Sequence, residues 1–139
     1  MNVLLVNPPS LSVFNTFGLS LPPIGLLYIA ASLEQAGHSV TVRDLAADGA
    51  RLEDQDIRRA DLVGISADTT RAGKALSIAR RVAAAGRPVV MGGPHPQFMA
   101  ADIFAAGCVD YIVKGEGELV FCNLLTALQN RDGVESVKG

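Results

Sequence analysis

The sequence predicts a protein of the α/β class, with a central parallel sheet covered by helices on both faces. Five short apolar runs recur along the 139 residues, and a stretch compatible with a helix follows each run. The runs are rich in β-branched residues and mostly lack alternation between apolar and polar positions, which is typical of strands buried on both faces. Strands that alternate with helices form right-handed βαβ units and therefore a parallel sheet.

The apolar runs define five expected strands. Five βαβ units in a chain of this length favour a Rossmann-like (flavodoxin-like) three-layer fold with strand order 2-1-3-4-5. In that order the switch point, where the strand order reverses, lies between the first and third strands. The expected strands cover residues 3–6, 39–42, 62–66, 88–91 and 109–113.

Start and stop signals for helices lie between these strands. Pro22-Pro23 precedes an apolar helix that Gly37 ends. Thr69 or Thr70 can cap a helix whose apolar positions recur at i, i+3, i+4 and i+7. The expected helices cover residues 24–36, 53–60, 72–83, 97–106 and 118–130, of which the second is short and charged.

Composition and charge limit the class of partner. Hydrophobic residues make up 49% of the chain and the net charge is −2 with both signs mixed, so we expect one globular domain over residues 1–130 that binds no nucleic acid. We expect neither a signal peptide nor a membrane span, since the apolar stretches are too short. The isolated Cys108 and Cys122 favour reduced thiols and a cytoplasmic location. Residues 131–139 are expected to be a linker.

The loop after the first strand supplies the first candidate site residues. Asn7, Pro8 and Pro9 open a connection that continues through Phe14 and Phe17 to Pro22-Pro23. Long connections inside compact domains tend to be functional, although an ordinary surface excursion is the alternative.

The third strand ends at a second group of candidates. Ser66 is followed by Asp68, Thr69 and Thr70. Their hydroxyl groups can bond a polar edge of a ligand or cap the next helix, and both uses remain open.

Two Gly-rich turns follow the fourth and fifth strands, Gly92-Gly93-Pro94-His95 and Gly115-Glu116-Gly117-Glu118. Because the carboxyl ends of parallel strands share one edge, where open α/β folds bind ligands, we expect both turns at one loop-built site. Glycine permits positive φ and close backbone approach, but a tight turn needs the same property. Carboxylates in the first turn of a helix suit its dipole and argue against a phosphate there.

Several familiar sites are absent from the pattern. Asn7-Pro8-Pro9 stands where a dinucleotide fingerprint requires glycines, and Gly73-Lys74-Ala75 does not complete a Walker loop. His38 is expected at the opposite edge of the sheet, and His95 has no partner at metal-ligand spacing. No nucleophile–base pair stands out, so the chain is equipped to hold a ligand rather than to catalyse alone.

In order and spacing, the loops resemble those of the N-terminal cobalamin-binding domain of cobalamin-dependent radical S-adenosylmethionine enzymes. The likeness extends over about residues 1 to 130. The segments that carry it are Asn7-Pro8-Pro9, residues 21–33, Gly37-His38-Ser39-Val40, residues 61–66, Gly92-Gly93-Pro94-His95, residues 109–113 and Gly115-Glu116-Gly117-Glu118.

This resemblance implies a domain that binds cobalamin over the carboxyl edge of its sheet, with the nucleotide tail inserted beside the sheet. In an intact enzyme the cobalt would carry a methyl group. The cofactor-binding residues it implies are Asn7, Pro8, Pro9, Pro23, Gly25, Leu26, Ser66, Asp68, Thr69, Thr70, Gly92, Gly93, Pro94, His95, Gly115, Glu116, Gly117 and Glu118.

Two departures qualify the resemblance. The Asp-x-His-x-x-Gly motif of the mutase and methionine-synthase cobalamin domains is missing, so we expect cobalt to be held without a histidine lower ligand. The Cys-x-x-x-Cys-x-x-Cys that binds an iron–sulfur cluster is also missing. The cluster and S-adenosylmethionine would then belong to a downstream radical S-adenosylmethionine domain, and the chain alone is expected to show no turnover.

Two other functions fit the same residues. One is a flavodoxin-like domain for another flat cofactor such as a flavin, which the few aromatic residues near the edge disfavour. The other is a regulatory or interaction domain with a vestigial pocket.

Overall fold

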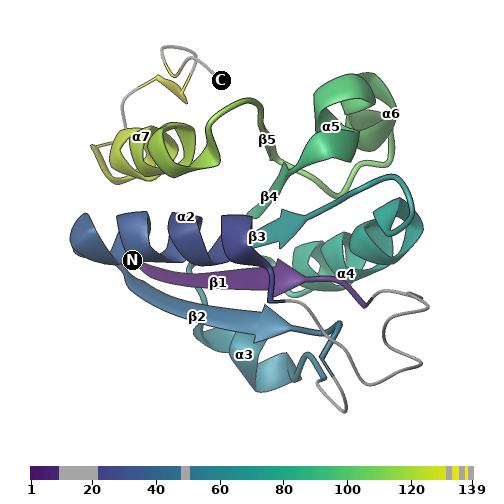
Figure 1. Ribbon diagram of the computed structural model, residues 1–139, viewed down its shortest axis with the longest axis horizontal. Coiled ribbons are helices and arrows are strands. Elements are labelled where there is room, and N and C mark those ends of the chain that lie inside the picture. The colour runs from purple at the N-terminus through teal and green to yellow at the C-terminus, as the bar shows by residue number, and fades with distance from the viewer. Residues whose placement is uncertain (10–21, 48–50, 131–132, 135–136, 138–139) are drawn as a thin grey trace.

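The computed structural model describes residues 1–9, 22–47, 51–130, 133–134 and 137, and its central element is a five-stranded parallel sheet (Figure 1). The strand order β2-β1-β3-β4-β5 confirms the predicted class and topology, with the reversal between β1 and β3. The strands are β1 (Asn2–Asn7), β2 (Ser39–Asp44), β3 (Leu62–Ser66), β4 (Val89–Gly92) and β5 (Tyr111–Val113).

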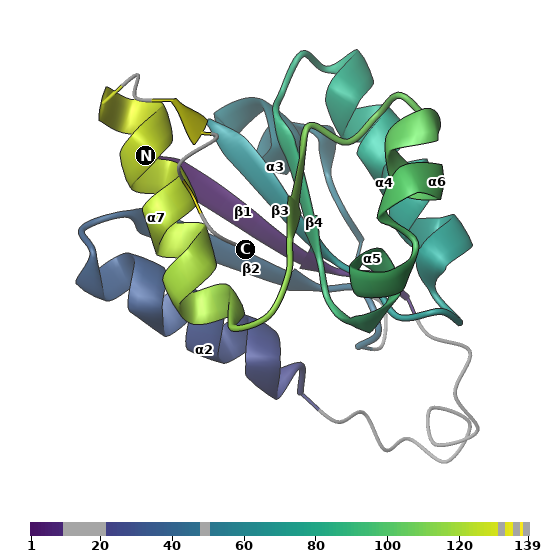
Figure 2. The same ribbon diagram turned by 90° about the horizontal axis from the view of Figure 1, so that it is seen from above.

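Helices cover both faces of the sheet. Figure 2 shows α2 and α7 together on one side, with α4 and α6 on the other. The helices are α2 (Ile24–Gln35), α3 (Asp54–Arg59), α4 (Ala72–Ala84), α5 (Pro94–Phe98), α6 (Ala100–Ala105) and α7 (Gly117–Asn130). The result is the expected three-layer arrangement.

Each face of the sheet has its own apolar core. On one face Leu4 and Val6 of β1 pack with residues of α3, α4 and α6. On the other face Val3 and Leu5 pack with residues of α2 and α7. Strand β1 is therefore buried on both sides, as its unbroken apolar run predicts, whereas the edge strand β2 is only partly buried.

Local signals explain where most helices begin and end. Glu53 and Asp56 form a reciprocal capping box at the start of α3, which supports this short, charged helix. The predicted stops Gly37 and Gly86 have φ of +86° and +71°, the left-handed conformation that commonly ends a helix.

Two helix predictions are wrong in detail. The helix expected over residues 97–106 begins earlier, at Pro94, because proline suits the first helical position, and it is divided into α5 and α6 at Met99. Neither Thr69 nor Thr70 caps α4, whose N-cap residue is Arg71 without a side-chain cap bond.

The described part of the C-terminal segment packs on the domain. Val134 and Val137 are partly buried against the core shared by α2 and α7. None of the described helices is long and apolar enough to cross a membrane.

Candidate functional site

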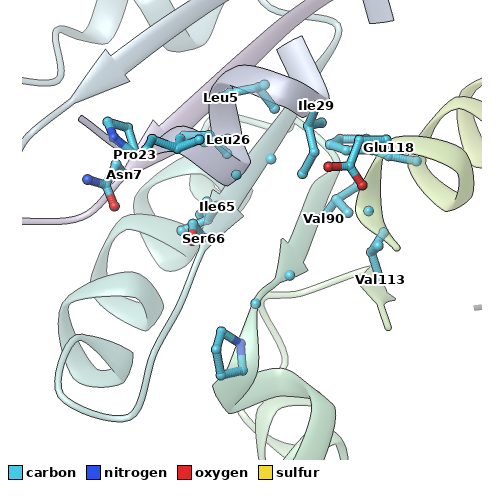
Figure 3. A pocket seen from close by; sticks show the side chains of 18 of the residues that line it. Leu5, Asn7, Pro23, Leu26, Ile29, Ile65, Ser66, Val90, Val113 and Glu118 are labelled. Atoms are coloured by element: carbon cyan, nitrogen blue, oxygen red, sulfur yellow. The ribbon is translucent and has the colours of Figure 1, made fainter. Parts of the chain in front are cut away.

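A cavity of about 580 Å³ opens at the carboxyl edge of the sheet, between the sheet and helices α2 and α7 (Figure 3). Leu5, Gly64, Val90 and Val113 contribute its sheet side, from four adjacent strands. Phe121 of α7 also lines it. A volume of this size is typical of sites that hold a small-molecule ligand.

Most of the predicted site residues meet at this cavity. Figure 3 shows Asn7 and Ser66 on one side of it and Glu118 on the other. The predicted residues that line it are Asn7, Pro23, Gly25, Leu26, Ser66, Gly92, Gly93, Pro94, Gly115, Glu116, Gly117 and Glu118.

The other predicted residues do not line the cavity, and they are Pro8, Pro9, Asp68, Thr69, Thr70 and His95. Pro8 is buried, and Pro9 borders a different cavity on the α4 side of the sheet. Thr69 is exposed and His95 is partly exposed. Phe14 and Phe17 lie outside the described residues.

The sequence interpretation missed several residues beneath and beside the site. They are Leu5, Ile29, Gly64, Ile65, Arg71, Val90, Val113 and Phe121. Most are apolar side chains, which in a buried strand or helix carry no signal in the sequence beyond packing in the core. Gly64 did carry one, because a glycine inside a strand often marks close approach of another group.

Gly64 occupies a position in β3 where any larger residue would collide with neighbouring side chains. A Cβ atom added to Gly64 would lie 2.8 Å from Leu5 Cδ2 and 2.9 Å from Phe121 Cε1. These two side chains come from the neighbouring strand and from α7, so the glycine lets both approach the cavity side of β3. The cavity's shape therefore depends on Gly64.

The turn after β4 is locked against the turn after β3. Gly93 has φ of +104°, and a Cβ there would lie 2.7 Å from the carbonyl oxygen of Ala67. The Ala67 N–H donates to Gly92 O at 2.8 Å, and the His95 N–H donates to Ala67 O at 3.1 Å. The backbone of His95 thus serves this junction. Glycine is required at position 93 both by conformation and by space.

A polar network joins the ends of β1, β2 and β3. The Asn7 side chain, which is nearly fully buried, donates from Nδ2 to Asp44 Oδ1 at 2.7 Å. Arg71 Nη1 donates to Asn7 Oδ1 at 2.7 Å, and Arg71 Nε donates to Asp68 Oδ2 at 2.6 Å. Thr70 Oγ1 donates to Asp68 Oδ1 at 2.7 Å. The sequence left open whether the polar residues after β3 bond a ligand or cap a helix. In the structure, Asp68 and Thr70 bond within this network.

The network keeps Asp68 ionised. Partial burial by itself would raise the pKa of Asp68, but hydrogen bonds from the Arg71 side chain, Thr70 and the Arg71 backbone outweigh it and lower the pKa to about 2. At neutral pH the cavity edge therefore carries a stable Arg71–Asp68 ion pair.

We expect Asp68→Asn to destabilise the protein by about 1–2 kcal/mol at pH 7, a figure reduced for the partial exposure of the pair. The folded pKa lies below the unfolded value of about 3.9, so this stabilisation is complete above that value and is lost as the pH falls toward 2. Urea unfolding of both proteins between pH 6 and pH 2.5 measures the difference. Asp54→Asn, in an exposed pair with Arg81, is the control and should change less. A difference that stays constant across this range would contradict the role of the charge.

Charges of opposite sign lie across the cavity. Glu116 and Glu118 line the side formed by the turn after β5 and the start of α7, whereas Arg71 lines the side formed by the turn after β3. Within the described ranges, no group of three or more His, Cys, Asp or Glu side chains converges as a metal site.

The second histidine lies far from this site, as predicted. His38 stands just before β2, at the amino edge of the sheet, with Nδ1 3.4 Å from the terminal amine. Burial, and then the charge of that amine, lower the pKa of His38.

Comparison with known proteins places this geometry in a family. The family described as "B12 binding domain" matches residues 11–125. A designed Rossmann 2x3 fold protein superposes with a TM-score of 0.53 at 10% identity, covering 100% of this chain and 96% of the design, which supports the fold alone.

Longer proteins share the sequence. An uncharacterized methyltransferase of Pyrococcus horikoshii is 33% identical over 100% of this chain and 32% of its own length. The anaerobic magnesium-protoporphyrin IX monomethyl ester cyclase of Synechocystis is 31% identical over 100% of this chain and 30% of its own length. The hopanoid C-3 methylase of Methylococcus capsulatus is 30% identical over 100% of this chain and 28% of its own length. The chain thus spans about a third of the length of the curated relatives it matches.

Proposed function

This chain belongs to the B12-binding domain family, and on that premise we propose that it holds cobalamin in and over the cavity between the sheet, α2 and α7. The observation that carries the proposal is the position of the cavity. It gathers most of the predicted residues at the carboxyl edge of β1, β3, β4 and β5, next to the switch point where open α/β folds bind ligands.

The residues present suit this cofactor. The cavity is too small to enclose a whole cobalamin, but it suits one part of it, leaving the wide macrocycle over the open edge. The sheet side is apolar and the mouth is formed largely by glycine-rich turns, so a flat group can approach backbone atoms closely. Because Gly64 has no side chain, Leu5 and Phe121 can pack close to β3 at the side of the cavity.

Individual residues would take different tasks. Leu5, Val90 and Phe121 would cover apolar parts of the inserted group, and the Ser66 hydroxyl would bond a polar atom. Glu116 and Glu118 would accept hydrogen bonds from amide N–H groups of the corrin side chains. Thr69 and His95, at the same edge but outside the cavity, would meet the part of the macrocycle that extends beyond it.

We propose that cobalt is held here without a histidine lower ligand from this domain. His95 does not line the cavity and uses its backbone to bond Ala67. His38 lies at the other edge of the sheet.

We also propose a cytoplasmic location for the protein. Cys108 and Cys122 are free thiols, and isolated thiols are typical of proteins kept in a reducing compartment.

We further propose that the chain is part of a longer cobalamin-dependent radical S-adenosylmethionine enzyme, joined through residues 131–139 to a domain that binds an iron–sulfur cluster. Bound cobalamin would supply methyl transfer through its cobalt. The relatives named methyltransferase and methylase, each about three times as long, support this assignment. A gene that lacks a Cys-x-x-x-Cys-x-x-Cys motif beyond codon 139 would count against it.

The outer face of α2 supports such a neighbour. Ile24, Leu27 and Tyr28 are 61%, 43% and 63% exposed, while the opposite face of the same helix is buried in the core. A helix that is apolar on both faces is typical of one covered on both sides. Since Ile24 also lines the cavity, this face adjoins the proposed cofactor.

The binding proposal is tested by adding hydroxocobalamin to the purified chain. We expect a change in the visible spectrum of the corrin and binding heat that saturates at one equivalent, with no turnover. The matched ligand is flavin mononucleotide, which should bind far more weakly, because Phe121 is the one aromatic side chain among the described residues that line the cavity and a flavin ring has little to stack on. Absence of cobalamin binding at tens of micromolar, or preferential binding of the flavin, would contradict the proposal.

A further inference from the structure

Arg71 is a cavity residue that neither the sequence pattern nor the family match singles out. It belongs to the turn between β3 and α4, and it is the one cation among the described residues that line the cavity. Its side chain is 24% exposed and lies beside that of Asp68. Asp68 itself does not line the cavity, so of the two partners of this ion pair only Arg71 borders it.

The known contacts of Arg71 leave part of its bonding capacity for a ligand. Nε and Nη2 lie 2.6 and 2.5 Å from Asp68 Oδ2, and Nη1 donates to Asn7 Oδ1 at 2.7 Å. These contacts use three of the five N–H groups of a guanidinium. Counting contacts among the described residues, one N–H remains on each terminal nitrogen.

The same contacts hold the guanidinium in place before a ligand arrives. Asp68 fixes it from its own turn, and Asn7, which is 64 residues away in sequence, fixes it from the end of β1. Asn7 is in turn held by Asp44 at the end of β2. A donor held both from its own turn and from β1 loses little conformational entropy when it bonds a ligand.

We propose that Arg71 is a ligand-binding residue that donates its remaining N–H groups to an acceptor oxygen of the bound cofactor. This inference rests on the proposed cobalamin function. Cobalamin offers two acceptors of the required chemistry, the carbonyl oxygens of the corrin side-chain amides and the phosphate oxygens of the nucleotide tail. The carboxylates of Glu116 and Glu118, on the other side, accept rather than donate, so the cavity would also orient the cofactor.

The experiment compares Arg71→Gln with Arg71→Lys, using spectroscopic titration with hydroxocobalamin and with dicyanocobinamide, which lacks the nucleotide tail. We expect Arg71→Gln to weaken cobalamin binding at least tenfold, as for a lost hydrogen bond to a charged donor, and Arg71→Lys to weaken it less. An equal loss with both ligands assigns the acceptor to the corrin amides, and a loss with cobalamin alone assigns it to the phosphate.

Two controls separate binding from structure. Arg80→Gln changes an exposed arginine of α4, the helix that follows Arg71; Arg80 lines none of the described cavities, so its replacement should leave affinity unchanged. Asp68→Asn removes a partner of Arg71 but keeps the guanidinium, so it should lower stability as much as Arg71→Gln while costing less affinity.

Two results would overturn the inference. One is wild-type affinity for both ligands in folded Arg71 variants, and the other is a loss of cobalamin affinity in Asp68→Asn equal to that in Arg71→Gln. Failure of the wild-type chain to bind cobalamin would instead overturn the proposed function.

Discussion

Replacing Gly64 with leucine is expected to weaken cobalamin binding at least a hundredfold, about 2.7 kcal/mol. The new Cβ alone would lie under 3 Å from Leu5 and Phe121, both of which line the cavity. The leucine would therefore displace these side chains and reshape the space that we assign to the cofactor. Titration with hydroxocobalamin, together with the far-ultraviolet circular dichroism and melting temperature of the variant, measures the effect.

Matched variants keep this experiment decisive. Gly73→Leu places the same side chain on α4, where a Cβ meets nothing within 4 Å, and should bind cobalamin like the wild type. If Gly64→Leu does not fold, Ile29→Trp enlarges a cavity residue of α2 without touching the sheet backbone. Wild-type affinity in a folded variant of either kind would show that cobalamin binds elsewhere.

Replacing Gly93 with alanine is expected to destabilise the fold by about 2–4 kcal/mol. Alanine would have to adopt a left-handed backbone conformation at this position, and its methyl group would lie 2.7 Å from the Ala67 carbonyl oxygen. A backbone atom cannot move aside as a side-chain tip can, so the junction between the turns after β3 and β4 must shift. Urea unfolding followed by circular dichroism measures the loss.

Gly92 is the natural control for this prediction because it is the adjacent residue. A Cβ at Gly92 would meet Val113 at 3.8 Å, an ordinary contact, and its φ is not in the left-handed region. We expect Gly92→Ala to cost under about 1 kcal/mol. Equal losses for the two alanine variants would contradict the explanation from backbone geometry.

The sequence was sufficient for the sheet because its strands are bounded by clear signals. Residues 62–66 are predicted as a strand and form β3 at Leu62–Ser66, since a short, mostly apolar run with β-branched residues is typical of a strand buried on both faces. The helix after β4 was harder. Pro94 starts a helix in this context, whereas a proline beside two glycines is equally typical of a turn.

The candidate site was predictable only in its loops. Glycine-rich turns are recognisable from the sequence, and most of the predicted turn residues do line the cavity. The contact of Arg71 with Asn7 joins residues 64 positions apart, and no local pattern encodes it. For Thr70 the local pattern is misleading. A hydroxyl just before a helix predicts a cap, but in the structure the Thr70 hydroxyl donates to Asp68 instead.

The separation of the two cores has a practical consequence. The cavity belongs to the layer of α2 and α7, while α4 lies behind the other face of the sheet, with Arg80 exposed on it. A dye or a surface tether attached at Arg80→Cys would therefore leave the mouth of the cavity facing solution. Cys108 is buried but Cys122 is only partly buried, so Cys122→Ala would accompany Arg80→Cys to give a singly labelled, immobilised sensor for corrinoids.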